Sequence, residues 1–103
     1  MERIEKLLAF LKDSPDDCFL NHALALEYIK LGNDEEAQLL FEKNYACAPV
    51  YVATYYHLGK LYERNSATEA ALRTFEEGMK VAKAAEDQHS YNELQGAYED
   101  LAY

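Results

Sequence analysis

The chain has 103 residues, of which 50% are hydrophobic and 28% charged, and 19 acidic residues against 10 basic ones give it a formal net charge of −9. This composition indicates one globular domain and excludes a disordered chain. The acidic balance argues against binding to nucleic acid, which needs basic residues to neutralise phosphates, and against binding to an anionic membrane surface. We expect basic or neutral partners.

The sequence has no segment typical of membrane insertion or export. No stretch approaches the ~20 apolar residues of a membrane-spanning helix. The apolar run over residues 7–11 is too short for the core of a signal peptide. We therefore expect a cytoplasmic protein without contact to a membrane.

The first predicted helix spans residues 2–12, because its apolar residues recur on one face at helical spacing. These residues are Ile4, Leu7, Leu8 and Leu11. We expect Ser14 to cap the second helix and Pro15 to occupy its first position. That helix should cover residues 15–31 and end at Gly32, which is a typical C-cap.

Three further helices follow without a linker, each with a start signal. Asn33, with Glu36 three positions later, resembles a capping box and opens a helix over residues 33–47. The other start signals are Pro49, for a helix over residues 49–64, and Ser66 in a capping box with Glu69, for a helix over residues 66–85.

The last predicted helix begins after Asp87 or Ser90 and has one apolar face. The residues of that face are Tyr91, Leu94, Tyr98 and Leu101. A one-sided helix at this place is typical of a solvating cap, because every repeat in a stacked array leaves its end face apolar.

Two stretches of the chain repeat each other at a distance of 34 positions (58 minus 24, for example). The matched pairs are Leu24 and Leu58, Tyr28 and Tyr62, Ala37 and Ala71, and Phe41 and Phe75. Pro15 likewise precedes Pro49 by 34 positions, so the first helix occupies the place of the second helix of a repeat. A helix-pair repeat of this period explains both observations.

These residues resemble the tetratricopeptide repeat family, whose pattern places an aromatic residue, Leu, Gly and Tyr before Ala and Phe. The second copy departs only at the aromatic residue, where Tyr55 replaces Trp, whereas the first copy carries Asn21 and Ala25 in the aromatic and Gly positions. The resemblance implies an all-α, TPR-type antiparallel helix-pair solenoid with a right-handed superhelix and about six helices. The implied divisions of this single domain are an N-terminal half repeat (1–17), repeat 1 (18–51), repeat 2 (52–85) and a C-terminal capping helix (86–103).

Two glycines fall inside predicted helices, where glycine costs about 1 kcal/mol relative to alanine. They are Gly59 and Gly78. This cost predicts a close approach between helices at both positions, and by the resemblance Gly59 lies in the family's small-residue position.

No residue pattern indicates catalysis or a cofactor. The three histidines, His22, His57 and His89, lie on separate helices, and no glycine-rich phosphate loop is present. Cys18 and Cys47 lack the spacing of zinc ligands, and we expect free thiols in a reducing compartment, with a disulfide as the alternative. We therefore expect a protein that is not an enzyme and needs neither a metal nor a cofactor.

The resemblance implies that the first helix of each repeat lines a concave groove that binds a peptide or a partner helix. The predicted groove residues are Phe19, His22, Leu26, Tyr56, Lys60, Glu63 and Arg64. Lys60 and Arg64 would receive a carboxylate of the partner, or else they would pair with Glu63 or be solvated. Two questions stay open: whether the first helix covers the groove, and which partner binds.

Two other functions remain alternatives. The first helix could present Ala9 and Phe10 to a second copy, which would make the chain a homo-oligomerisation element. A small helical regulator that binds a low-molecular-weight ligand is the more remote alternative, because no residue pattern favours it.

Overall fold

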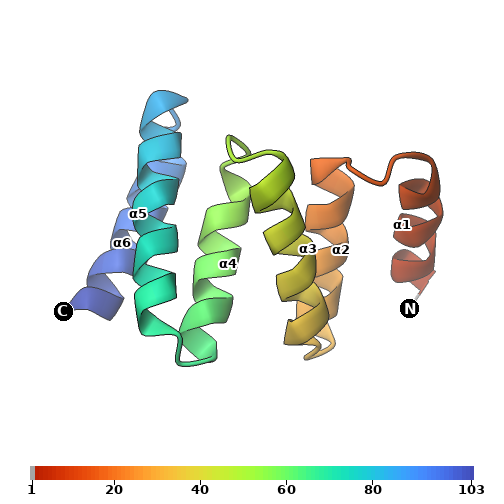
Figure 1. Ribbon diagram of the computed structural model, residues 1–103, viewed down its shortest axis with the longest axis horizontal. Coiled ribbons are helices and arrows are strands. Elements are labelled where there is room, and N and C mark those ends of the chain that lie inside the picture. The colour runs from red at the N-terminus through yellow and green to blue at the C-terminus, as the bar shows by residue number, and fades with distance from the viewer. Residues whose placement is uncertain (1) are drawn as a thin grey trace. The chain divides into compact units, whose positions relative to one another are not determined.

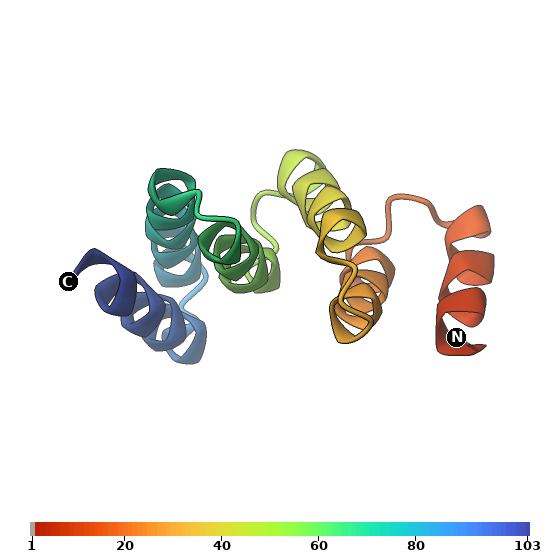
Figure 2. The ribbon, with the colours of Figure 1, turned by 90° about the horizontal axis from the view of Figure 1, so that it is seen from below.

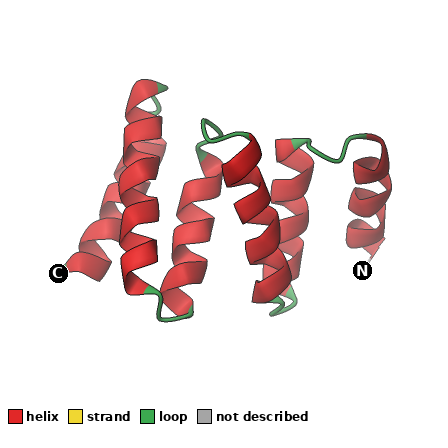
Figure 3. Cartoon of the chain, viewed as in Figure 1, coloured by secondary structure: helices red, strands yellow, loops and turns green. Residues whose placement is uncertain are grey.

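The computed structural model describes residues 2–103, which form six α-helices and no strand (Figures 1 and 3). The helices are α1 (Glu2–Asp13), α2 (Cys18–Lys30), α3 (Asp34–Cys47), α4 (Ala53–Arg64), α5 (Thr68–Ala84) and α6 (Gln88–Ala102). The prediction of an all-α fold with about six helices is confirmed. Among the described residues, no helix is both long and apolar enough to cross a membrane.

The helices form two compact units, one up to Ala48 and the other from Pro49 to Tyr103. The boundary lies close to that between the predicted repeats, at residues 51 and 52. Within each unit, helices that follow one another along the chain run antiparallel (Figures 1 and 2).

The first unit contains α1, α2 and α3. Its core joins residues of α1 to residues of α2, with support from α3. Ile4, Leu7, Ala23 and Leu24 are buried, and Leu11, Leu20, Tyr28 and Leu40 pack around them. At the edge of this core the Nε atom of Arg3 lies 3.3 Å from Oε2 of Glu27, which links α1 to α2.

The two prolines precede their helices instead of opening them, so the predicted starts of α2 and α4 are wrong. Asp17 is the N-cap of α2 and accepts a hydrogen bond from the backbone N–H of Leu20. Pro15 and Pro49 lie in turns, where their carbonyl groups accept hydrogen bonds from side chains of the following helix.

Those two hydrogen bonds are equivalent although the side chains differ. Nδ2 of Asn21 donates to the Pro15 carbonyl at 3.0 Å, and the hydroxyl of Tyr55 donates to the Pro49 carbonyl. Donor and acceptor are each displaced by 34 positions between the two copies. Asn21 therefore donates in the first copy the hydrogen bond that Tyr55 donates in the second. This shared hydrogen bond explains why an amide can occupy the aromatic position.

Three helix ends share one turn, in which a single residue adopts the left-handed conformation. Gly32, Ser66 and Glu86 have φ values of 76°, 63° and 58°. In each turn the following N–H donates to a carbonyl five residues earlier at 2.9 Å, as Asn33 does to Tyr28, which is the Schellman motif. Ser66 thus ends α4 and is not the predicted cap of α5, whose N-cap is Ala67.

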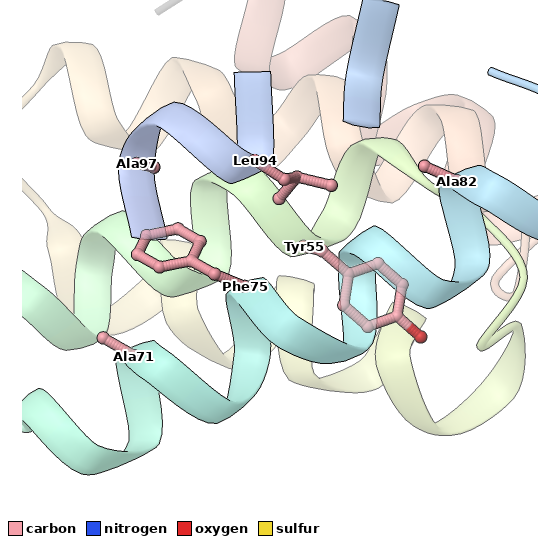
Figure 4. Close-up of a cluster of buried hydrophobic side chains, with 6 residues drawn as sticks. All are labelled: Tyr55, Ala71, Phe75, Ala82, Leu94 and Ala97. Atoms are coloured by element: carbon pink, nitrogen blue, oxygen red, sulfur yellow. The ribbon is translucent and has the colours of Figure 1, made fainter. Parts of the chain in front are cut away.

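The second unit buries a cluster of side chains between α4, α5 and α6 (Figure 4). Its buried members are Tyr55, Ala71, Phe75, Ala82, Leu94 and Ala97. α6 contributes Leu94 and Ala97, which are 1% and 7% exposed, and its N-cap is Asp87. The predicted apolar face of this helix is confirmed, because Tyr91, Tyr98 and Leu101 also pack against the cluster.

Two glycines allow this close packing, as predicted. A Cβ atom at Gly59 would lie 2.3 Å from Cε1 of Phe75, and a Cβ atom at Gly78 would lie 2.6 Å from Cβ of Tyr55. Real Cβ atoms do not approach other atoms so closely. Only glycine therefore permits the observed separation of α4 and α5.

Candidate functional site

The first set of predicted groove residues lies on α2 in the first unit. Phe19, His22 and Leu26 follow three- and four-residue spacings, so they share one face of the helix. The opposite face carries Leu24, which is buried in the core with α1, and Tyr28, which packs against that core. α2 therefore packs through one side and leaves a second, partly apolar side outside that core.

Exposure differs sharply along this face. Phe19 is 66% exposed, whereas His22 and Leu26 are half-buried. The His22 ring packs edge-on against Phe41 of α3, with the ring centres 5.4 Å apart. Because α1 packs on the other side of α2, it does not cover Phe19.

The second set of predicted groove residues lies on α4 in the second unit. Nζ of Lys60 is 3.3 Å from Oε1 of Glu63, and both side chains are 34% exposed. The alternative prediction that Lys60 pairs with Glu63 is therefore confirmed. Arg64, one turn beyond Lys60, is exposed at the end of α4.

The side chain of Tyr56 is less exposed than we predicted for a residue that lines a binding groove. It is half-buried and packs against the core cluster of the second unit. Its ring also meets that of His57 edge-on, with the ring centres 5.4 Å apart. Tyr56 thus supports the fold of α4 as well as lining its surface.

His57 is a half-buried titratable residue of α4 that lies outside the predicted groove set. Burial lowers its pKa below the ordinary value of 6.5, the nearby carboxylate of Glu93 on α6 raises it, and Arg64 lowers it further. The burial of His57 depends on how α6 packs beside α4, so its position on the predicted helix could not reveal this environment.

The two cysteines do not form a disulfide. Cys18 is half-buried and Cys47 exposed, and both are free thiols. Within residues 2–103, no group of three or more His, Cys, Asp or Glu side chains is arranged to hold a metal ion.

Comparison with known proteins decides the family. The chain matches no protein-family model and no curated protein sequence. A tetratricopeptide repeat domain protein from Salinibacter ruber, however, has a crystal structure that superposes with a TM-score of 0.82 and 43% sequence identity, over 84% of this chain and 96% of that one. The chain belongs to the tetratricopeptide repeat family.

Two further solved structures share this fold. A solution structure of a tetratricopeptide repeat domain protein from Salinibacter ruber gives a TM-score of 0.80 at 44% identity, over 84% of this chain and 88% of that one. A protein from Bordetella parapertussis gives a TM-score of 0.81 at 25% identity, over 96% of this chain and 86% of its own length. The tetratricopeptide repeat fold predicted from the 34-residue period is thereby confirmed.

Membership of the tetratricopeptide repeat family explains the two sets of surface residues. The first set belongs to the first helix of repeat 1 and the second set to the first helix of repeat 2, as the register of Leu24 and Leu58 predicts. Such domains are helical repeats that serve protein–protein interaction.

Proposed function

We propose that the chain is a non-catalytic protein-interaction module that holds a peptide or a partner helix against the first helices of its repeats. A cytoplasmic location belongs to the same proposal. The observation that carries it is Phe19, a large apolar side chain that is 66% exposed on a helix already packed through its other face. An exposed aromatic residue contributes nothing to a core, but at an interface it is among the residues that contribute most binding energy.

The surroundings of Phe19 suit an apolar anchor. Leu26 and the edge of His22 share its helix face and are half-buried, so they form a partly preformed surface instead of mobile side chains. A preformed surface favours binding because less side-chain freedom is lost when the partner docks. We infer that the partner inserts an apolar side chain beside Phe19.

The charge on α4 supports a second contact. Arg64 is exposed at the end of α4, and Lys60 lies one turn before it on the same helix. An arginine can bind a carboxylate through two parallel hydrogen bonds, which favours Arg64 over Lys60 as the contact. We therefore assign an acidic group or a carboxyl terminus of the partner to Arg64.

The test uses peptides selected from a displayed random library on the wild-type chain, whose affinities are then measured by calorimetry. Phe19→Ala and Arg64→Ala should each weaken binding by about tenfold or more, corresponding to about 1.4 kcal/mol. Leu39→Ala and Arg73→Ala are matched controls, because Leu39 is 61% exposed on α3 and Arg73 is exposed on α5. Both controls should bind like the wild type.

Two results would contradict the proposal. If the selected peptides bind Phe19→Ala and Arg64→Ala as tightly as the controls, the binding face lies elsewhere. If the library yields no peptide with measurable affinity, short peptides are not the ligands. We exclude Tyr56→Ala from this set, because Tyr56 packs against the core and its loss would reduce stability as well as binding.

A further inference from the structure

A surface depression in the second unit combines apolar walls with one basic residue. It is lined by Val50, Lys80, Val81, Ala84 and Ala85. Val50, in the turn before α4, is 78% exposed, and the two alanines at the end of α5 are also exposed. Val81 is half-buried and packs against the core cluster of this unit. Most of the apolar surface of the depression is therefore not used by the fold of the unit.

The turn that carries Val50 is fixed in place. The carbonyl of Pro49 accepts a hydrogen bond from the hydroxyl of Tyr55, and Tyr55 is buried with its Cβ atom close to α5 at Gly78. A side chain on a fixed turn brings less loss of freedom when a partner docks. The depression is therefore largely preformed.

Lys80 adds a positive charge to this apolar surface. It is exposed, and among the described residues it forms no ion pair. A ligand that places an apolar side chain in the depression and a carboxylate beside Lys80 would match both features.

The exposed side of α3 has this chemistry. Leu39 is 61% exposed, and Glu35 and Glu36 precede it by four and three positions, so all three residues lie on one side of the helix. Both glutamates are exposed, and within residues 2–103 neither forms an ion pair. Lys43, four positions after Leu39, has its charge balanced by Asp16 at 3.5 Å.

Two other exposed leucines match the depression less well. Glu27, four positions before Leu31, is already paired with arginine and lysine side chains. Lys12, four positions after Leu8, would repel Lys80. Opposite charges favour one register and like charges disfavour others, so the charges select α3 over these two sites.

We propose that α3 of a second copy docks on the depression, with Leu39 against Val50 and the end of α5 and with Glu35 beside Lys80. Each copy carries both surfaces, so the chain can associate with itself. The contact joins different surfaces of two identical chains and is therefore heterologous. It uses none of the predicted groove residues and is independent of the proposed function.

The experiment measures mass by sedimentation velocity over a range of concentrations of the 103-residue chain. The weight-average mass of the wild type should rise with concentration above that of a monomer. Lys80→Glu and Glu35→Lys each bring like charges together across the contact, so each variant alone should associate at least tenfold more weakly. Leu39→Ala should also weaken association, because it removes the apolar side chain that fills the depression.

The decisive samples restore opposite charges across the contact. An equimolar mixture of Lys80→Glu and Glu35→Lys should associate like the wild type, and so should a single chain that carries both substitutions. The matched controls are Arg73→Glu on α5 and Glu99→Lys on α6, which change the net charge by the same amounts at exposed positions outside both surfaces. These controls should associate like the wild type, and all variants should keep the helical signal.

Three outcomes would overturn the proposal. The first is a wild-type chain that stays monomeric at every concentration. The second is a folded Lys80→Glu or Glu35→Lys variant that associates like the wild type, because such association would use another surface. The third is a chain with both substitutions that stays monomeric, because Lys80 and Glu35 would then not meet each other.

Discussion

Replacement of Gly78 by alanine tests how closely α5 approaches its neighbours. The added Cβ would lie 2.6 Å from Cβ of Tyr55 and 3.0 Å from Cδ1 of Leu94. The Tyr55 atom is attached directly to the backbone, so it cannot rotate away and α4 and α5 must separate. Such overpacking costs about 1–3 kcal/mol, against which alanine regains about 1 kcal/mol of helix propensity. We expect a net loss of stability of up to about 2 kcal/mol.

Gly96→Ala supplies the matched control for this substitution. Gly96 lies within α6, but a Cβ atom there would meet nothing within 4 Å. Its replacement should therefore stabilise the chain by about 1 kcal/mol through propensity alone. Urea unfolding of both variants gives the packing cost as their difference, about 1–3 kcal/mol. Equal stabilisation by the two substitutions would refute the close approach of α4 and α5.

Three other changes probe the turns, the core and the pH response. Gly32→Ala should lower the free energy of unfolding by about 1 kcal/mol, because alanine is strained at φ 76°. Ser66→Gly should raise the melting point, because glycine relieves the same strain at φ 63°. Leu94→Ala should destabilise by about 2–5 kcal/mol in urea unfolding, because its side chain is 1% exposed. Burial lowers the pKa of His57 in the folded chain, so the unfolded chain binds more protons just below pH 6.5. Stability should therefore be complete above pH 6.5 and decrease as the pH falls towards the lowered pKa, and His57→Asn should flatten this dependence in urea titrations at several pH values.

The 34-residue repeat predicted the fold correctly, but the residue types that are common at helix starts predicted wrong positions for some helix starts. Leu24 and Leu58 occupy equivalent buried positions, as their 34-residue spacing requires. Pro15 and Ser66 were assigned to helix starts because those residue types are common there, yet both lie in turns. A residue type favours several local conformations, whereas a repeated pattern of buried residues fits only one arrangement of helices.

The candidate site could be predicted less completely, because exposure depends on neighbouring helices. The pattern placed Phe19 and Tyr56 on equivalent helices, but Phe19 is exposed and Tyr56 packs against the core cluster. The ion pair of Lys60 with Glu63 follows from their three-residue spacing and was one of two alternatives. The pKa of His57 is lowered mainly by burial and raised in part by Glu93, which lies on another helix and has no fixed spacing from it.

Asn21 and Tyr55 show how function can be separated from fold in this chain. Their side chains differ in size and chemistry, but each donates a hydrogen bond to the carbonyl of the proline six residues before it. At this position the repeat requires a hydrogen bond to the proline carbonyl, and either side chain can donate it. The replacement of the aromatic residue by Asn21 therefore gives no evidence about binding. Phe19 is the opposite case, because it is large, apolar and exposed on a helix whose core contacts are made by Ala23 and Leu24. The fold accounts for Asn21 but not for Phe19, and for this reason Phe19 is the first residue to test for contact with a partner.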